Sequence, residues 1–169
     1  FLADFVGVQS SQIRKDFSYF GDFGTRGVGY SIEKLAREIK KILRLDAMRQ
    51  VALVGVGDLG SALLTYSGFG SYGLDIVAAF DVDVQKIGTT INGIRIEDLS
   101  EIDDLGQRGI MLAIVAVPQA SAQSTIDRLA EAGIRGVLNF APCRVVAPPR
   151  VKIVTLDIAM ELARLPYYM

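Results

Sequence analysis

The sequence has no histidine and only one cysteine, Cys143. Without histidine the chain lacks the side chain that most often serves as a general acid or base. With a single cysteine it cannot form an internal disulfide, which fits a reducing compartment. We therefore expect a cytoplasmic protein. Because no histidine can activate it, Cys143 is more consistent with a buried apolar thiol than with a nucleophile.

Long apolar runs are also missing. The most hydrophobic stretch is interrupted by Asp58, Asp75, Asp81 and Asp83, whereas a helix that spans a bilayer needs about 20 apolar residues in succession. We expect no membrane span. Residues 1–5 contain neither an initiating Met nor the basic start and cleavage site of a signal peptide, so the start is interpreted as truncated rather than secretory.

The chain has 169 residues, and half of them are hydrophobic. This is enough to bury the core of one domain together with a small appendage. The net charge of −1 conceals an asymmetry, because residues 1–50 carry a net +3 and the remainder −4. A basic N-terminal region followed by an acidic remainder indicates two modules with different partners.

The basic N-terminal region contains two helical patterns. Apolar residues at helical spacing, with Ser10 and Ser11 available as N-caps, predict a short helix over 10–20. A stretch rich in glycine follows, and it predicts turns. A second amphipathic helix is predicted from Ser31 to about Leu45. The polar stretch 46–50 is the expected domain boundary.

Beyond residue 50, apolar runs of strand length alternate with helical patterns. The predicted strands are 51–55, 75–80, 110–117, 136–140 and 152–156, and the main predicted helices are 59–66 and 120–132. Strands that are apolar almost throughout have both faces covered, which is typical of a parallel sheet between helix layers. We predict a doubly wound α/β fold, with a small hairpin turn at Asn92 and Gly93.

The first predicted strand runs directly into a G-x-G-x-x-G motif before a helix. Its residues are Gly55, Val56, Gly57, Asp58, Leu59 and Gly60. The first glycine permits the tight turn, the second lets a pyrophosphate approach the backbone, and the third allows close packing of helix on strand. The helix N-terminus then faces the phosphates. For Asp58 we favour a helix cap without cofactor contact.

Asp81 and Val82 directly follow the predicted strand 75–80, and Asp81 lies 21 residues after Gly60. A carboxylate at this position accepts hydrogen bonds from the adenosine ribose. It also repels a 2′-phosphate, and no Arg follows in residues 82–84. The pattern predicts NAD(H) rather than NADP(H) as the cofactor. The alternative is a solvated carboxylate at the strand end or a helix cap.

Two later strands end in prolines at the edge where such sheets bind ligands. The candidate cofactor-binding residues there are Val117, Pro118, Asn139, Phe140 and Ala141. Each proline is expected to stop its strand. Asn139 is a candidate for the nicotinamide side, and its role as a turn former before Pro142 is an equal alternative.

The chain offers no convincing catalytic group for hydride transfer. Tyr30 and Lys34 have the Y-x-x-x-K spacing of short-chain dehydrogenases, but they precede the glycine motif instead of following it. Asp157 stands at a strand-to-helix junction, where capping is the simpler interpretation. We predict no catalytic residue, no metal site and no enzymatic activity, with a small NAD-dependent oxidoreductase using Asp157 or Tyr66 as the alternative. A third possibility is a nucleotide-binding regulatory domain of a transporter or another complex.

Several segments together resemble the bacterial redox-sensing transcriptional repressor family Rex. They are 11–21 (SQIRKDFSYFG), 26–30 (RGVGY), 80–83 (FDVD), 138–142 (LNFAP) and 156–159 (LDIA). The resemblance spans essentially the whole chain. It implies a Rossmann-type NAD(H)-binding domain over 48–155, preceded by a winged helix-turn-helix module over 1–47 and followed by a dimer-swapped helix over 156–169.

The same resemblance implies a function. Such repressors bind palindromic operator DNA as homodimers and release it when NADH replaces NAD+. The implied DNA-binding residues are Ser11, Gln12, Arg14, Lys15 and Arg26, and the implied redox-switch residues are Tyr66, Asp157 and Ile158. The first helix of the winged module, with the basic partner of Asp157, is missing, so we expect the truncated chain to bind NAD(H) and dimerise but not to bind DNA.

Overall fold

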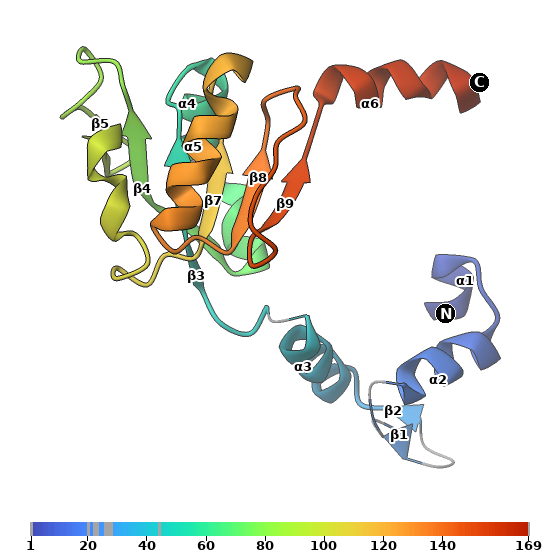
Figure 1. Cartoon of the computed structure of the whole chain (residues 1–169). Helices are drawn as coiled ribbons and strands as arrows, with labels where there is room; N and C mark the ends of the chain where they lie inside the picture. Colours follow the sequence, from blue (N-terminus) through green and yellow to red (C-terminus); the bar gives the residue numbers. More distant parts are fainter. Residues whose placement is uncertain (1, 20, 22–23, 26–28, 44, 169) are drawn as a thin grey trace. The chain divides into compact units, whose positions relative to one another are not determined.

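The computed structural model describes residues 2–19, 21, 24–25, 29–43 and 45–168. It divides into two compact units, Phe1–Ala47 and Met48–Met169. Figure 1 shows the elements of both units along the chain. No helix within the described ranges has the length and apolar character needed to cross a membrane.

The first unit consists of short helices and a small hairpin. In chain order they are α1 (Leu2–Val6), α2 (Ser10–Ser18), β1 (Gly24–Thr25), β2 (Gly29–Tyr30) and α3 (Ile32–Ile42). The two strands are antiparallel. The ring of Phe17 in α2 meets that of Tyr30 edge to face at a centroid distance of 5.5 Å, which joins the helix to the hairpin.

The ends of α2 differ from the prediction. The residue that precedes the helix is Gln9, whose side chain makes no capping hydrogen bond. The expectation that Ser10 or Ser11 caps the helix is therefore wrong, because both already have helical backbone. By contrast, Ser31 does cap α3, since its hydroxyl accepts a hydrogen bond from the Lys34 N–H.

The second unit is built on one seven-stranded sheet. Its strands are β3 (Arg49–Val54), β4 (Leu74–Asp81), β5 (Thr90–Ile91), β6 (Ile94–Asp98), β7 (Leu112–Val115), β8 (Gly136–Asn139) and β9 (Lys152–Thr155). The spatial order is β5-β6-β4-β3-β7-β8-β9, and only the β5–β6 pair is antiparallel. From β6 to β9 this is the strand order of a Rossmann fold, which confirms the predicted fold class.

Six helical segments connect or follow these strands. They are α4 (Asp58–Thr65), η1 (Ser67–Tyr72), η2 (Leu99–Asp104), α5 (Gln119–Glu131), α6 (Ile158–Arg164) and η3 (Leu165–Tyr168), of which the three labelled η are 3₁₀ helices. The prediction included α4 and α5. It did not include η1 or η2, because 3₁₀ segments of six residues are too short to show a helical period.

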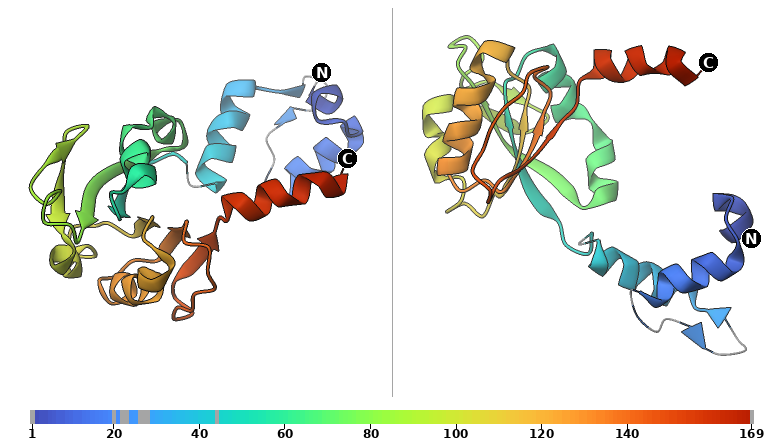
Figure 2. Two further views of the ribbon diagram at one scale, coloured as in Figure 1. Left: turned by 90° about the horizontal axis from the view of Figure 1, so that it is seen from above. Right: turned by 45° about the vertical axis from the view of Figure 1, so that its right-hand side comes forward.

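Alternate residues of β3 enter two separate cores. Val51 and Leu53 pack in one core with Leu64 of α4, whereas Ala52 and Val54 pack in the other with Ile126 of α5. The two helices thus cover opposite faces of the sheet, as Figure 2 shows. This explains why the strand sequences are apolar almost throughout.

The centre of the sheet has a topological switch point between β3 and β7. From β3 the chain continues to β4 on one side, and it returns later to β7 on the other side. Ligands of such sheets bind in the crevice outside the carboxyl ends of the two strands that flank the switch point. The segments that follow Val54 and Val115 are therefore the place to look for a ligand.

The first strand of the second unit begins at Arg49, two residues earlier than predicted. Arg49 and Gln50 belong to β3, where they pair with Leu74 and Asp75 of β4. Arg49 and Gln50 have polar side chains, which suggested that they precede the strand. Polar residues are tolerated here because the amino end of even a central strand lies near the surface. The division between Ala47 and Met48 nevertheless falls inside the stretch 46–50 where the boundary was predicted.

The predicted hairpin turn at Asn92 and Gly93 is confirmed. Both residues have positive φ, 50° and 79°, as a two-residue turn between antiparallel strands requires. The Asn92 amide also donates a hydrogen bond of 2.8 Å to the Leu64 carbonyl oxygen near the end of α4. One residue thus forms the turn and satisfies a carbonyl that the helix leaves without a partner.

Two substitutions of Asn92 separate these roles. Asn92→Gly keeps the left-handed backbone and removes the hydrogen bond, so we expect it to lower the free energy of unfolding by about 1 kcal/mol. Asn92→Ala adds the cost of left-handed backbone and should lose about 1 kcal/mol more. Urea denaturation measures both, and equal stability of Asn92→Gly and the unmodified chain would contradict a role for the bond.

The helix α6 leaves the sheet at the end of β9 and extends away from it (Figure 1). None of its residues is buried. From α6 through η3, the exposed large apolar side chains are Ile158, Met160, Leu162, Leu165, Tyr167 and Tyr168. An apolar surface of this kind on a helix without intramolecular packing is typical of an interaction site.

Candidate dinucleotide-binding site

The glycine motif forms the turn between β3 and α4. Gly55 has a φ of 93°, and a Cβ atom there would lie against the carbonyl oxygen of Ala116 in the segment after β7. A Cβ atom on Gly60 would lie against the carbonyl oxygen of Gly55. Neither position has room for a side chain, because the added Cβ atom would collide with a backbone oxygen. At Gly55 the positive φ also disfavours any residue other than glycine.

Gly57 is different, because a Cβ atom there would have no neighbour within 4 Å. Nothing within the chain requires a glycine at this position. The open space lies just before the N-terminus of α4, where the unpaired N–H groups and the helix dipole favour an anion. The three glycines thus have the three separate roles that a dinucleotide pyrophosphate requires.

Asp58 does not cap α4. The helix begins at Asp58 itself, and the residue in the capping position is Gly57, with no capping side chain. The interpretation of Asp58 as a cap is therefore wrong. Without a capping side chain, the first N–H groups of the helix remain available to a ligand.

Asp81 is buried at the carboxyl end of β4, with 8% of its surface exposed. Its Oδ2 atom accepts a hydrogen bond of 2.7 Å from the Val56 N–H, and its Oδ1 atom accepts bonds of 2.8 and 2.9 Å from the Val82 and Asp83 N–H groups. The alternative of a solvated carboxylate is therefore wrong. Asp81 ties the glycine turn to the neighbouring strand.

These contacts change the acidity of Asp81. Burial alone would raise the pKa of the carboxyl group. The backbone N–H groups of Asp83, Val56 and Val82 and the positive charge of Lys86 act in the opposite direction, and the pKa lies below its ordinary value of 3.8. The carboxylate is consequently ionised at neutral pH and presents a negative charge beside the glycine turn.

Lys86 was not among the predicted site residues. Its Nζ atom lies 3.6 Å from Asp81 Oδ2 and 3.7 Å from Asp83 Oδ2. The sequence shows no Arg in residues 82–84, and the nearest cation stands two positions further along. The turn from Asp83 to Lys86, closed by a hydrogen bond from the Lys86 N–H to the Asp83 carbonyl oxygen, brings it back to the carboxylate.

The segments after β7 and β8 lie at the same end of the sheet as the glycine turn, because these strands are parallel to β3. A Cβ atom on Gly55 would come within 3.0 Å of the Val117 side chain, so Val117 borders the glycine turn. The strands end at Val115 and Asn139, before the prolines that were expected to stop them. Pro118 instead occupies the capping position of α5. Val117, Pro118, Phe140 and Ala141 lie at the predicted edge of the sheet, and their contact with a cofactor stays a prediction.

Asn139 is fully buried and forms a turn. Its amide donates a hydrogen bond of 3.0 Å to the Ala141 carbonyl oxygen and accepts one of 3.0 Å from the Ala141 N–H. A further bond of 3.3 Å reaches the Thr155 hydroxyl in β9. The structure thus supports the turn-forming alternative, and Asn139 positions the backbone of Phe140 and Ala141.

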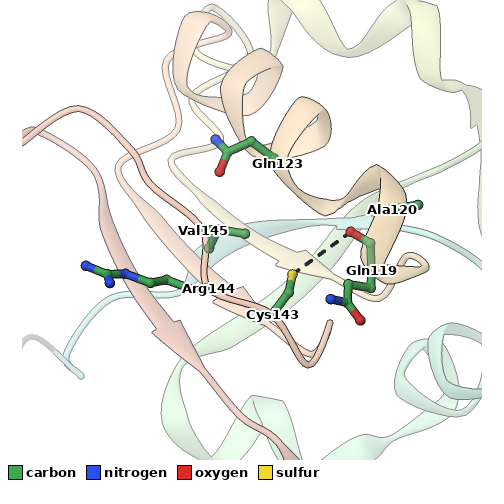
Figure 3. Close-up of a pocket in the computed structure, with 6 residues that line it drawn as sticks. All are labelled: Gln119, Ala120, Gln123, Cys143, Arg144 and Val145. Carbon is green, nitrogen blue, oxygen red and sulfur yellow. Dashed lines mark hydrogen bonds between the residues drawn. The ribbon is translucent and has the colours of Figure 1, made fainter.

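A cavity of about 520 Å³ adjoins this edge at the start of α5. Figure 3 shows the residues that line it, which are Gln119, Ala120, Gln123, Cys143, Arg144 and Val145. Cys143 is only partly buried, contrary to the expectation of a buried thiol, and its Sγ atom lies 4.0 Å from the Gln119 carbonyl oxygen. The Oε1 atom of Gln123 accepts a hydrogen bond of 3.0 Å from the Val146 N–H.

Comparisons with known proteins agree with this geometry. Residues 46–143 match the model of the family described as CoA binding domain. The redox-sensing transcriptional repressor Rex of Halalkalibacterium halodurans is 43% identical over 168 residues, which cover 99% of this chain and 80% of that protein. Rex of Desulfitobacterium hafniense is 44% identical over 167 residues, with 98% and 80% covered. The chain belongs to the Rex family.

Solved structures of RSP, a Rex-family repressor, also match. RSP in complex with beta-NAD+ and operator DNA superimposes with a TM-score of 0.92 at 33% identity, covering 99% of this chain and 77% of RSP. RSP in complex with beta-NADH gives a TM-score of 0.83 at 31% identity, with 99% and 78% covered. The predicted resemblance to Rex is thereby confirmed.

The residues that the Rex resemblance assigns to a redox switch come from two places in the second unit, the end of α4 and the start of α6. Tyr66 follows α4 and is 60% exposed, with its ring edge to face on Phe69 at 5.2 Å. Asp157 caps α6 by accepting a hydrogen bond of 3.0 Å from the Met160 N–H, which confirms the capping interpretation. Ile158 is exposed beside it. Their switch roles stay predictions.

Four of the five residues assigned to DNA binding lie on α2. Ser11, Arg14 and Lys15 are spaced to share one helix face, and all three are exposed. Gln12 donates a hydrogen bond of 2.7 Å to Asp16. Arg26, the residue assigned to the wing, lies outside the described residues.

Proposed function

We propose that this Rex-family chain is a transcriptional repressor that reports the ratio of NADH to NAD+. The full-length protein binds operator DNA as a homodimer and leaves it when NADH replaces NAD+. The observation that carries the proposal is the glycine turn at the switch point, with the ionised Asp81 beside it. RSP, which has the same fold, binds NAD+ together with operator DNA and also binds NADH.

The first unit is the DNA-binding module. Its order of helices and hairpin, with α2 before β1 and β2, suits a winged helix-turn-helix. In such modules the recognition helix enters the major groove and contacts base edges with its N-terminal residues. Ser11 lies in the first turn of α2, Arg14 at its middle and Lys15 in its last turn. Arg14 is suited to guanine and Lys15 to phosphate or guanine.

The helix α6 supplies the dimer contact. The segment 156–169, which contains α6 and η3, is exchanged between two subunits, and this would cover the exposed apolar side chains of Ile158, Met160 and Leu162. In the exchanged position Ile158 approaches the nicotinamide of the partner subunit, with Asp157 and Tyr66 completing the switch. A twofold dimer matches a palindromic operator, and the site of action is the cytoplasm.

The chain acts without catalysis. It contains no histidine, and the Asp157 carboxylate is engaged as a helix cap. The described residues contain no group of three or more metal-ligating side chains. An NAD-dependent oxidoreductase is not favoured, because the relatives that cover nearly the whole chain carry the name of a repressor.

Operator binding with each cofactor tests the proposal. We expect fluorescence anisotropy of the full-length protein with labelled palindromic DNA to show affinity at least about tenfold weaker with NADH than with NAD+, which is the usual size of such coupling. The double variant Arg14→Ala/Lys15→Ala serves as a matched control. It should lose DNA affinity and keep the fluorescence change that accompanies NADH binding.

Two outcomes would contradict this function. Equal DNA affinity with the two cofactors would refute redox sensing, because a ligand shifts an equilibrium only through its differential affinity for the two states. Absence of any sequence-selective DNA binding would favour a nucleotide-binding regulatory domain of another complex. Turnover of NADH with carbonyl substrates would support the oxidoreductase alternative.

A further inference from the structure

The ribose end of the cofactor site carries three charged groups. Asp81 and Asp83 are carboxylates two residues apart, and the Lys86 ammonium group lies within 4 Å of both, at 3.6 and 3.7 Å. Their combined charge is −1. A 2′-phosphate bound here would lie near one cation as well as two anions. Its electrostatic environment therefore depends on all three groups and not on Asp81 alone.

The arrangement is fixed rather than incidental. Asp81 cannot turn away from Lys86, because its carboxylate is buried and held by three backbone N–H groups. The turn that carries Lys86 is closed by hydrogen bonds from the Lys86 and Ile87 N–H groups to the Asp83 carbonyl oxygen. A further bond of 3.0 Å joins the Gln85 N–H to Asp83 Oδ1.

We propose that Lys86 sets how strongly the site discriminates between NAD(H) and NADP(H). It offsets the carboxylate charge at the ribose end and thereby limits the rejection of a 2′-phosphate, while it holds Asp81 in position for the ribose. This inference rests on the proposed binding of NAD(H). It identifies Lys86 as a specificity-determining residue of that site.

The physical reason lies in the different charges of the two cofactors. The ribose of NAD(H) is neutral and donates hydrogen bonds to a carboxylate, so removal of a nearby cation changes its affinity little. A phosphate monoester carries a charge of about −1.5 to −2 near neutral pH. Its free energy therefore depends directly on the sum of the charges around it. Removing Lys86 changes that sum from −1 to −2.

Substitution of Lys86 tests the proposal. We expect Lys86→Met to weaken NADPH binding by about tenfold and NADH binding by less than about threefold, since the pair lies near the surface and is partly screened. Asp83→Asn should act in the opposite direction and strengthen NADPH binding relative to NADH. Its side-chain oxygen can still accept the bond from the Gln85 N–H, so the turn is retained.

The controls distinguish a local effect from a general one. Lys152→Met removes one positive charge from the exposed start of β9, three strands from β3 in the sheet order, and should leave the ratio of NADH to NADPH affinity unchanged. Dissociation constants come from the fluorescence of the reduced cofactors, at low and high salt, and the effect of Lys86→Met on the ratio should shrink at high salt.

Equal weakening of both cofactors by Lys86→Met would overturn the proposal, because it would assign Lys86 a structural role only. A shift of the same size in Lys152→Met would also overturn it. If the unmodified chain failed to bind NADH at all, the proposed function would be wrong. That result is distinguishable from a failure of the Lys86 proposal, in which the unmodified chain binds NADH but Lys86→Met leaves the ratio of NADH to NADPH affinity unchanged.

Discussion

Gly60→Ala is expected to abolish detectable NAD(H) binding and to destabilise the second unit by about 3 kcal/mol, at the upper end of overpacking effects. The added methyl group would lie against the carbonyl oxygen of Gly55. This neighbour is backbone, and it belongs to a turn with little room to move, because Gly55 itself lies against Ala116. The helix α4 must therefore shift away from β3, and its N-terminal N–H groups shift with it.

Gly57→Ala is the matched control within the same turn. Its methyl group would have no neighbour within 4 Å, and the backbone φ of −78° suits any residue. The variant should remain within about 1 kcal/mol of the unmodified chain, the usual cost of changing a capping residue. It should nevertheless bind NAD(H) poorly, because the methyl group occupies the space into which a pyrophosphate must come.

The two variants are compared by urea denaturation without cofactor and by NADH fluorescence. The expected result is that both lose NADH affinity while only Gly60→Ala loses stability. Normal NADH binding by Gly57→Ala would place the pyrophosphate elsewhere. Unchanged stability of Gly60→Ala would show that α4 can shift at no cost, in contrast to the close packing described above.

The fold was predictable because its signals are local in sequence. The apolar strands, the glycine motif at the end of the first strand and the Asn92–Gly93 turn each occupy a few consecutive residues. Their meaning follows from strand period, backbone conformation and loop length. The order of the strands in the sheet was not predicted and is known from their pairing in the structure.

The details that the sequence did not predict depend on which atoms meet in three dimensions. Asp58 has the chemistry of a cap, but whether it caps depends on whether the helix begins one residue earlier or later. Asn139 was undecided until its bonds to Ala141 and Thr155 were known. Lys86 is one of many cations in the sequence, and only the turn from Asp83 brings it to Asp81.

Asp81→Asn is expected to weaken NADH binding by about 30-fold and to lower the free energy of unfolding by about 2 kcal/mol near neutral pH, since hydrogen bonds to a charged group are lost. An asparagine has one accepting oxygen instead of two. It cannot accept from Val56 on one side and from Val82 and Asp83 on the other, so one attachment of the glycine turn to β4 is lost.

The effect on stability should depend on pH in a defined direction. The pKa of Asp81 in the folded chain lies below its ordinary value of 3.8. The stabilisation is therefore fully present above that value, and it is lost as the pH falls through the lower pKa of the folded state. Denaturation curves of the two proteins should differ near neutral pH and converge as the carboxylate is protonated.

A constant difference between the two proteins at every pH would assign the loss to packing rather than to charge. Asp83→Asn provides the comparison, because Asp83 is less buried than Asp81 and its Oδ1 atom accepts a hydrogen bond from the nearby Gln85 N–H. That variant should change stability by less than about 1 kcal/mol at any pH. A large loss in Asp81→Asn alone would show that the buried carboxylate, and not the general negative charge of this edge, holds the glycine turn in place.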